Sequence, residues 1–310
     1  MRAERNLNAG ARPDRRAPAA GDLAAVPYAD DGALTDRDFE RFRALVRDRS
    51  GIVLGPHKRS LLRARLDRRL RALALANFGQ YYEYLTSGAH PDEVERFVNA
   101  ITTNKTDFFR EAHHFGFIAE RWAPALRQAA SRGGTRRLRV WSAACSTGEE
   151  PYTLAMTLLD AGLVPPEWDV RILASDIDTE VLGRARAGIY QAERVEPVPE
   201  PLRRRWFLRS RRDPGVLRVR PALQALITWK QINFIDEAWP VRGPFDMILC
   251  RNALIYFDRA GQRAILTRFQ RLLKPDGVLI LGHSESVLGL AEGFVNLGAT
   301  IYRRAPGASV

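Results

Sequence analysis

Hydrophobic residues recur at helical spacing between residues 33 and 101, with polar residues filling the positions between them. The pattern predicts amphipathic helices within 34–51, 58–75, 78–88 and 91–102. The first has Thr35 and Asp38 at capping-box spacing, and Gly51 supplies a stop. We therefore expect residues 33–101 to form a small all-helical domain.

Leucines and cations share the second of these helices. Leu62, Leu66, Leu70 and Leu73 fall on one stripe, which predicts a face packed in the domain core. The stretch 57–71 also holds seven Lys or Arg residues and a single Asp. This cationic surface is either a solvated face or a docking surface for an acidic partner.

The pattern changes after residue 136, where short strand-like runs alternate with helical ones. Strands are predicted in 137–144, 169–178, 245–252 and 274–285, and helices in 149–162, 179–190 and 258–273. This alternation predicts an α/β fold with a doubly wound, parallel sheet. One more strand is expected within 228–234 and a single closing edge strand within 294–304. The segment between, about 190–228, is predicted to be a small, partly antiparallel β insertion.

Residues 1–32 lack periodicity and are rich in Ala, Arg, Pro and Gly, which predicts a disordered tail. The helical domain would follow it, and a second domain would comprise residues 102–310. No run of 18 apolar residues is present, so no membrane span is expected. The beginning of the chain lacks the apolar segment of a secretory signal. Two distant cysteines give no disulfide framework, and a cytoplasmic location is expected.

The formal net charge of +12 favours acidic partners, namely nucleic acid, anionic lipid or an acidic protein surface. A second basic cluster, 201–220, has eight Arg and one Asp. RNA binding would require aromatic residues interleaved with the cations, and the cluster in 57–71 has none, so no nucleic acid is expected. Five histidines, among them His113, His114 and His283, and two separated cysteines are a poor ligand set for zinc, so no metal is expected.

The loop after the first predicted strand, "SAACSTGEEP" (142–151), has the composition of a ligand loop. Small side chains before Gly148 allow close approach of the backbone, and Glu149 and Glu150 begin the next helix. Neither a dinucleotide fingerprint nor a P-loop is present. The two carboxylates would repel a pyrophosphate and suit an ammonium group, although a tight turn before a well-charged helix is the simpler alternative.

Asp176 ends the second predicted strand, where doubly wound folds place a carboxylate that binds ribose hydroxyls. The alternative is a helix N-cap, a role that Asp178 can fill instead. A ligand with a nucleoside and an ammonium group but no pyrophosphate fits S-adenosylmethionine. The residues therefore point to a methyltransferase.

The stretch "NKTDFFRE" (104–111) places Phe108 and Phe109 between a polar turn and the pair Arg110–Glu111. By itself it is consistent with a helix N-terminus capped by Thr106 or Asp107. A second interpretation depends on the rest of the chain.

Five motifs resemble the chemotaxis receptor glutamate O-methyltransferases, the CheR family: "TTNKTDFFREAHHF", "VWSAACSTGEEPY", "ASDIDTEVLGRARAGIY", "FDMILCRNALIYF" and "LLKPDGVLILGHSE". The resemblance covers about 33–305. It implies an enzyme that transfers a methyl group from S-adenosylmethionine to glutamates on the cytoplasmic helical bundle of chemoreceptors, forming glutamate methyl esters and S-adenosylhomocysteine.

The resemblance also implies a site. The family's cofactor contacts fall on Asn104, Thr106, Arg110, Glu150, Asp176, Asn233, Phe234, Arg251 and Asn252. Arg110 and Tyr256 match catalytic positions, with Tyr256 near the transferred methyl group unless it is a core aromatic. The stretch 104–111 then becomes a linker anchored by its two phenylalanines, which aims Arg110 at the cofactor's carboxylate. Cys145 stands where the family commonly has alanine, and we expect no effect on the chemistry.

Partners follow from the same resemblance. The basic helix 57–71 would dock on acidic receptor helices, and the β insertion resembles a subdomain that in some members captures a receptor's C-terminal peptide. We expect a monomer, peripheral to receptor arrays. The alternative to an enzyme is a non-catalytic adaptor that binds receptors. Such an adaptor could lack Arg110, Asp176 or Tyr256, and because all three are present the enzyme is favoured.

Overall fold

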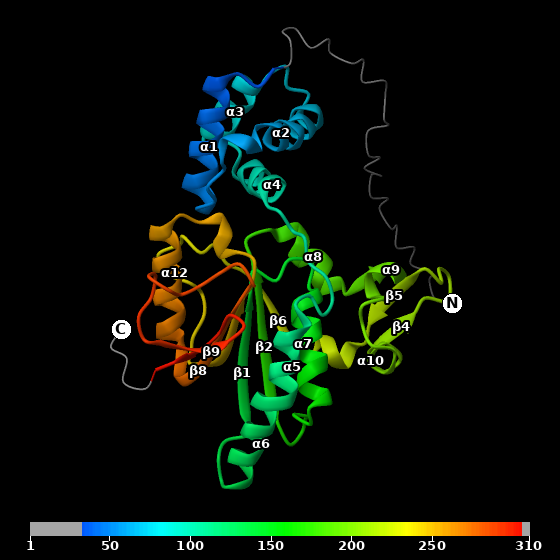
Figure 1. Ribbon diagram of the computed structural model, residues 1–310. Helices are drawn as coiled ribbons and strands as arrows, with labels where there is room; N and C mark the ends of the chain where they lie inside the picture. Colours follow the sequence, from blue (N-terminus) through cyan, green and yellow to red (C-terminus); the bar gives the residue numbers. More distant parts are fainter. Residues whose placement is uncertain (1–32, 306–310) are drawn as a thin grey trace, which may run out of the picture.

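The computed structural model describes residues 33–305 and shows a group of helices joined to a larger body built on a sheet (Figure 1). The predicted tail 1–32 lies outside the described residues. Within the described part, no helix is long and apolar enough to cross a membrane. The fold class expected from the sequence is confirmed, whereas the exact domain boundaries stay a prediction.

The predicted helical group is present between residues 36 and 101. Its helices are α1 (Asp36–Ser50), α2 (Arg59–Leu73), α3 (Phe78–Thr86) and α4 (Pro91–Ile101), with a short 3₁₀ turn, η1 (Pro56–Lys58), before α2. The capping box is confirmed, because the Asp38 amide donates to Thr35 Oγ1 at 3.1 Å. Gly51 adopts a left-handed φ of 73° and ends α1. The predicted leucine stripe of α2 packs in the core of this group.

The cations of α2 divide into two sets. Arg69 is internal, since it pairs at 2.6 Å with Glu93, which is only 4% exposed and also accepts from the Tyr81 hydroxyl. Arg65 donates to the carbonyl of Thr102 at 2.7 Å and so ties α2 to the end of α4. Arg59 pairs with Asp36, and the exposed set consists of Arg63, Arg68 and Arg71. Only this second set is available to a partner.

The larger body contains a seven-stranded sheet in the order β6-β2-β1-β7-β8-β10-β9, with five parallel strands from β6 to β8. Its strands are β1 (Arg137–Ala143), β2 (Asp169–Asp176), β6 (Ile227–Gln231), β7 (Phe245–Cys250), β8 (Leu273–Leu281), β9 (Phe294–Gly298) and β10 (Ile301–Arg304). The parallel part agrees with the prediction. The single strand predicted in 294–304 is instead an antiparallel hairpin, turned through left-handed Ala299 and Thr300.

Helices cover both faces of this sheet (Figure 1). α5 (Ala112–Phe117), the π-helix η2 (Ile118–Trp122), α6 (Ala123–Ser131) and α7 (Glu149–Asp160) contribute to one hydrophobic cluster, and α12 (Arg259–Leu272) to the other. Successive residues of β1 serve opposite faces, since Val140 belongs to the first cluster and Trp141 to the second. The sequence analysis assigned no element to 112–131.

The predicted insertion follows α8 (Thr179–Ala187). Its antiparallel sheet has the order β3-β5-β4, formed by β3 (Ile189–Gln191), β4 (Phe207–Arg209) and β5 (Val216–Val219). Three short helices complete it: α9 (Ala192–Val195), α10 (Glu200–Trp206) and α11 (Pro221–Gln224). β3 and β4 are the edge strands of this small sheet.

Hydrogen bonds join the helical group to the sheet-containing body at several points. They are Thr102 Oγ1 to Asp178 Oδ2 (2.7 Å), Asn99 Nδ2 to Thr179 Oγ1 (2.9 Å), Asn233 Nδ2 to the Arg49 carbonyl (2.8 Å) and the Val53 amide to the Tyr256 carbonyl (2.8 Å). An ion pair between Arg47 and Asp258 at 2.6 Å adds to them. These contacts hold the helical group over the ends of β2, β6 and β7.

Candidate functional site

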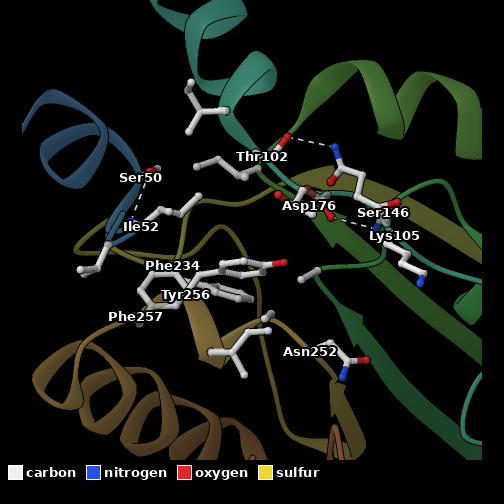
Figure 2. A pocket seen from close by; sticks show the side chains of 18 of the residues that line it. Ser50, Ile52, Thr102, Lys105, Ser146, Asp176, Phe234, Asn252, Tyr256 and Phe257 are labelled. Atoms are coloured by element: carbon white, nitrogen blue, oxygen red, sulfur yellow. Dashed lines mark hydrogen bonds between the residues drawn. The ribbon is translucent and has the colours of Figure 1, made fainter. Parts of the chain in front are cut away.

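A cavity of about 520 Å³ lies where the two parts of the chain meet. Its floor comes from residues directly after β1, β2 and β7, and its roof from the loop 51–58 between α1 and α2. Parallel strands whose carboxyl ends meet at one edge commonly bind ligands there. Figure 2 shows the side chains that enter this space.

All ten side chains expected at the site line this one cavity. They are Asn104, Thr106, Arg110, Glu150, Asp176, Asn233, Phe234, Arg251, Asn252 and Tyr256. They come from the segment after α4, the start of α7, and the segments after β2, β6 and β7. The fold therefore brings together residues separated by up to half of the chain, while their individual roles stay predictions.

The segment 104–111 is an irregular linker, so the interpretation as a capped helix N-terminus is wrong. The next helix, α5, begins only at Ala112, and the Asp107 carboxylate pairs with Arg194 at 2.8 Å. Phe108 is 1% exposed and Phe109 packs against the same core cluster, as the linker interpretation requires. Arg110 lines the cavity, with its Nη1 donating to the Lys105 carbonyl at 2.8 Å.

Asp176 and Asp178 take the two different roles that the sequence left open. Asp178 caps α8, since its Oδ1 accepts from the Glu180 amide at 2.9 Å. Asp176 faces the cavity and accepts from the amides of Ser146, at 2.8 Å, and Asp178, at 3.0 Å (Figure 2). Each carboxylate oxygen can accept a second hydrogen bond, so Asp176 has capacity for ligand hydroxyls.

Burial governs the charge of Asp176. It raises the pKa of the Asp176 carboxyl to about 6, although the amides that donate to it oppose the rise. The Asp176 carboxyl is therefore mostly ionised at pH 7 and mostly protonated at pH 5. Nearby Cys145 is also buried, and burial raises the pKa of its thiol, so it stays an uncharged, small apolar side chain.

A buried ion cluster borders the cavity. Arg251, whose side chain is 2% exposed, lies between Glu150 at 3.0 Å and Glu111 at 3.2 Å. Burial raises the pKa of Glu150, and the charge of Arg251 opposes that rise. Arg251 Nε is buried and has no hydrogen-bond partner within the part of the chain that the structure describes.

The two glutamates of the ligand loop point to different surroundings. Glu150 lines the cavity and also accepts from the Ser142 hydroxyl at 2.7 Å. Glu149 is buried and accepts from Arg194 at 2.7 Å. Of the two glutamates, Glu150 alone lines the cavity, and it is the one that the resemblance implies as a cofactor contact.

Tyr256 belongs to a 3₁₀ turn, η3 (Leu254–Tyr256), after β7. Its side chain is half-buried and lines the cavity, so Tyr256 is not a core aromatic. Figure 2 shows it beside Phe234, on the side of the cavity away from Lys105. The site thus has a polar part near Asp176 and an aromatic part near Tyr256.

The sequence analysis missed the contribution of the helical group to this site. Ile52, Val53, His57 and Lys58 line the cavity from the loop between α1 and α2. The available signal was an apolar run, "IVL", between Gly51 and Gly55. A short apolar run outside any predicted helix indicates a contact with another part of the protein.

His113, His114 and His283 do not line the cavity. Burial lowers the pKa of His114 to about 4, and its Nε2 lies 2.9 Å from the Ala299 carbonyl oxygen. His283 Nδ1 lies 2.8 Å from Glu111 Oε1. Among residues 33–305, no three His, Cys, Asp or Glu side chains are grouped to hold a metal ion.

Comparisons with known proteins agree with this geometry. The sequence model of the CheR methyltransferase all-alpha domain matches residues 37–102, and that of the CheR methyltransferase SAM binding domain matches 104–303. A chemotaxis protein methyltransferase of Escherichia coli K12 is 46% identical over 87% of this chain and 91% of its own length. Chemotaxis protein methyltransferase 2 of Pseudomonas aeruginosa is 43% identical over 87% and 94%, and a chemotaxis protein methyltransferase of Borreliella burgdorferi 34% identical over 83% and 90%.

Proposed function

The chain belongs to the CheR methyltransferase family, and we propose that it methylates glutamate side chains on the cytoplasmic helical bundle of chemoreceptors. S-adenosylmethionine is the cofactor of this family, as the name of the matched domain states. The observation that carries the proposal is the single cavity that all ten expected site residues line. The cavity opens between the cofactor-binding body and the cationic helical group, where an acidic helix can approach.

The residues present fit this cofactor. Asp176 would accept hydrogen bonds from the ribose hydroxyls, and Glu150 would face the ammonium group. Arg110 would bind the carboxylate, because a guanidinium donates two parallel hydrogen bonds to such a group. Arg251 also lines the cavity and would hold Glu150 in place through their ion pair. The bound cofactor supplies a methyl group activated by the positive charge on sulfur.

Cofactor affinity is expected to depend on pH through Asp176. Ribose hydroxyls donate to the ionised carboxylate, so the affinity for S-adenosylhomocysteine should be highest above pH 6 and fall as pH drops through about 6. We expect a loss of about tenfold between pH 7 and pH 5, one decade per pH unit below the pKa. Calorimetric titration over this range measures it.

An Asp176→Asn variant is the matched control, because it has the same shape and no titrating group. Its affinity should be lower at pH 7 and constant between pH 5 and pH 7. The same pH dependence in Asp176→Asn would show that another group is responsible.

The proposed acceptor needs no general base. A glutamate carboxylate has a reference pKa of about 4.3 and is already ionised at pH 7. The chain's own part is to orient that carboxylate and to exclude water from it. Tyr256 lines the cavity and would donate a hydrogen bond to the carboxylate, while the apolar residues of the loop 51–58 would cover the site.

Turnover is accordingly expected to be flat between pH 6 and pH 8 and to fall only in acid, as the acceptor carboxylate becomes protonated. Tyr256→Phe should slow kcat by about 5- to 10-fold through loss of one hydrogen bond, with little change in cofactor affinity and no new pH dependence. The measurement is a pH–rate profile at saturating cofactor and receptor.

His57 is the histidine that makes this test stringent, because it lines the cavity. An ascending limb near pH 6.5 that disappears in His57→Ala, or in His114→Ala or His283→Ala, would contradict a base-free mechanism. A flat profile in the wild type and in all three variants supports it.

Two surfaces are proposed for the receptor. The exposed cations of α2, including Arg63 and Arg68, suit acidic receptor helices, and α2 follows directly on the loop 51–58 that covers the cavity. Among residues 33–305, the edge strands β3 and β4 of the insertion each pair with one strand only, β5, so a receptor's C-terminal peptide could add to the other side of either strand. We further propose that the enzyme works as a monomer at receptor arrays.

The function is tested by incubating the protein with methyl-labelled S-adenosylmethionine and membranes that contain a candidate chemoreceptor. Label should enter the receptor and be released as methanol by mild base, as a carboxyl methyl ester requires. Receptors with the acceptor glutamates replaced by alanine should stay unlabelled. Label that is stable to base, or that enters RNA added to the same mixture, would contradict the proposal.

A further inference from the structure

Glu285 is a buried carboxylate that the proposed mechanism does not use. It lies in the loop after β8 and is 6% exposed. Its Oε2 accepts from the amides of Gly282, at 2.6 Å, and Asn252, at 2.8 Å, while its Oε1 accepts from the amide of Ile255 at 3.3 Å. Within residues 33–305 it forms no ion pair with a cation. Backbone amides alone therefore hold this carboxylate.

We propose that Glu285 is a positioning residue that fixes the loop after β7 in its active conformation. Two of the three amides that donate to Glu285 belong to this loop, namely those of Asn252 and Ile255. Tyr256 directly follows Ile255 in the sequence. Asn252 and Tyr256 both line the cavity, whereas Glu285 does not. Glu285 thus acts on the cofactor through Asn252 and on the acceptor through Tyr256. The second effect rests on the proposed function, and the first requires only the cofactor.

Asn252 has an uncommon backbone conformation. Its φ of 58° lies in the left-handed region, which asparagine adopts more readily than most residues other than glycine. Hydrogen bonds from two neighbouring segments hold this conformation. Glu285 holds the Asn252 amide, and Glu111 Oε1 accepts from the Asn252 side chain at 3.3 Å.

Gly282 lies in close contact with both Asn252 and Glu285. A Cβ atom on Gly282 would lie 2.5 Å from Asn252 Nδ2 and 2.8 Å from Glu285 Oε2. Glycine at 282 therefore allows the loop after β8 to approach the loop after β7 closely enough for the shared hydrogen bonds. The loops after β7 and β8 are thus joined here by close packing and by hydrogen bonds.

The contact also explains why the side chain is a carboxylate. Three amide donors converge on its two oxygens, and a carboxylate is an acceptor only. Glutamine offers a single acceptor oxygen, so one of its NH₂ hydrogens would face an amide N–H. Glu285→Gln therefore keeps the shape of the side chain and removes at least one of the three hydrogen bonds.

The test is the affinity of Glu285→Gln for S-adenosylhomocysteine, measured by calorimetry without a receptor. We expect binding to be about tenfold weaker, as for the loss of one hydrogen bond to a charged group. Glu93→Gln is the matched control, because Glu93 is equally buried but lies in the core of the helical group. It should lower the melting temperature and leave this affinity within about twofold of wild type, since hydrogen bonds far from a site contribute independently.

A double-mutant cycle separates positioning from a general loss of stability. If Glu285 acts through Asn252, Glu285→Gln should weaken binding much less in an Asn252→Ala background than in the wild type. Fully additive effects, or wild-type affinity in folded Glu285→Gln, would overturn the proposal. Should Glu285→Gln fail to fold, Gly282→Ala tests the same contact from the other side: weaker binding supports the proposal and wild-type affinity overturns it.

The proposed effect of Glu285 on the acceptor, through Tyr256, is tested by measuring kcat with a receptor that the wild type methylates. Glu285→Gln should lower kcat in the wild-type background and lower it less in the Tyr256→Phe background. A wild type that methylates no chemoreceptor would contradict the proposed function and leave the binding result intact. Equal losses of kcat in both backgrounds would overturn the positioning of Tyr256.

Discussion

Asp176→Ala is expected to weaken the binding of S-adenosylhomocysteine by about 1.5–3 kcal/mol, or roughly 10- to 150-fold, the range for hydrogen bonds to a charged group. The carboxylate stands at the end of β2 inside the cavity, where two backbone amides fix its direction. Alanine removes the acceptor for the ribose hydroxyls and leaves both amides without a partner. Calorimetric titration at pH 7 measures the loss.

Asp169→Ala is the control for this variant. Asp169 begins the same strand at its opposite end and pairs with Arg139 and Arg171 on the surface. Because surface ion pairs contribute little, its substitution should leave cofactor affinity unchanged. An Asp176→Ala protein that unfolds cooperatively and binds like the wild type would remove Asp176 from the ribose site.

Reversing the charge of Arg63 and Arg68 to glutamate is expected to lower kcat/KM for the receptor by about tenfold or more at low salt, because like charges then face the acidic helices. Cofactor affinity should not change, since both side chains are exposed on α2 and neither lines the cavity. Methylation rates measured over a range of receptor concentrations give the effect. The difference from wild type should shrink as salt rises and the Debye length falls.

Arg132→Glu/Arg136→Glu is the matched charge reversal. These two arginines are also exposed but precede β1, far along the chain from α2. This control changes the net charge by the same amount and should keep most of the receptor activity. Equal losses in the two double variants would show that net charge alone matters, and full activity of Arg63→Glu/Arg68→Glu would make the basic face of α2 a solvated surface.

Much of the fold was predictable because it rests on local patterns. Helical periodicity located α1 to α4, and the alternation of strands and helices located β1, α7, β2, α8, β7, α12 and β8. The capping box at Thr35, the stop at Gly51 and the cap at Asp178 involve residues within a few positions of one another. Such features do not depend on the rest of the molecule, so a single sequence carries them.

The hairpin of β9 and β10 and the helices of 112–131 were not predictable in this way. The hairpin turns through Ala299 and Thr300, two left-handed residues other than glycine, so that Gly298 (φ 101°) beside them gave the only turn signal. The helical stretch 112–131 changes from α to π and back to α, so its hydrophobic residues do not keep one helical period. Local patterns fail where tertiary contacts select a conformation that the residues do not favour by themselves.

The fold class, the family and the ten candidate site residues could be read from the sequence, because they follow from local periodicity and from motifs in a fixed order. The availability of charges could not: the folded protein pairs Arg69 with the buried Glu93 and leaves Arg63 and Arg68 exposed to solvent. It also brought the loop 51–58 over the cavity and joined Glu285 to Asn252. Both contacts join segments far apart in the chain. Whether such distant segments touch depends on how whole helices and strands pack, and the spacing of residues within one segment does not contain this information.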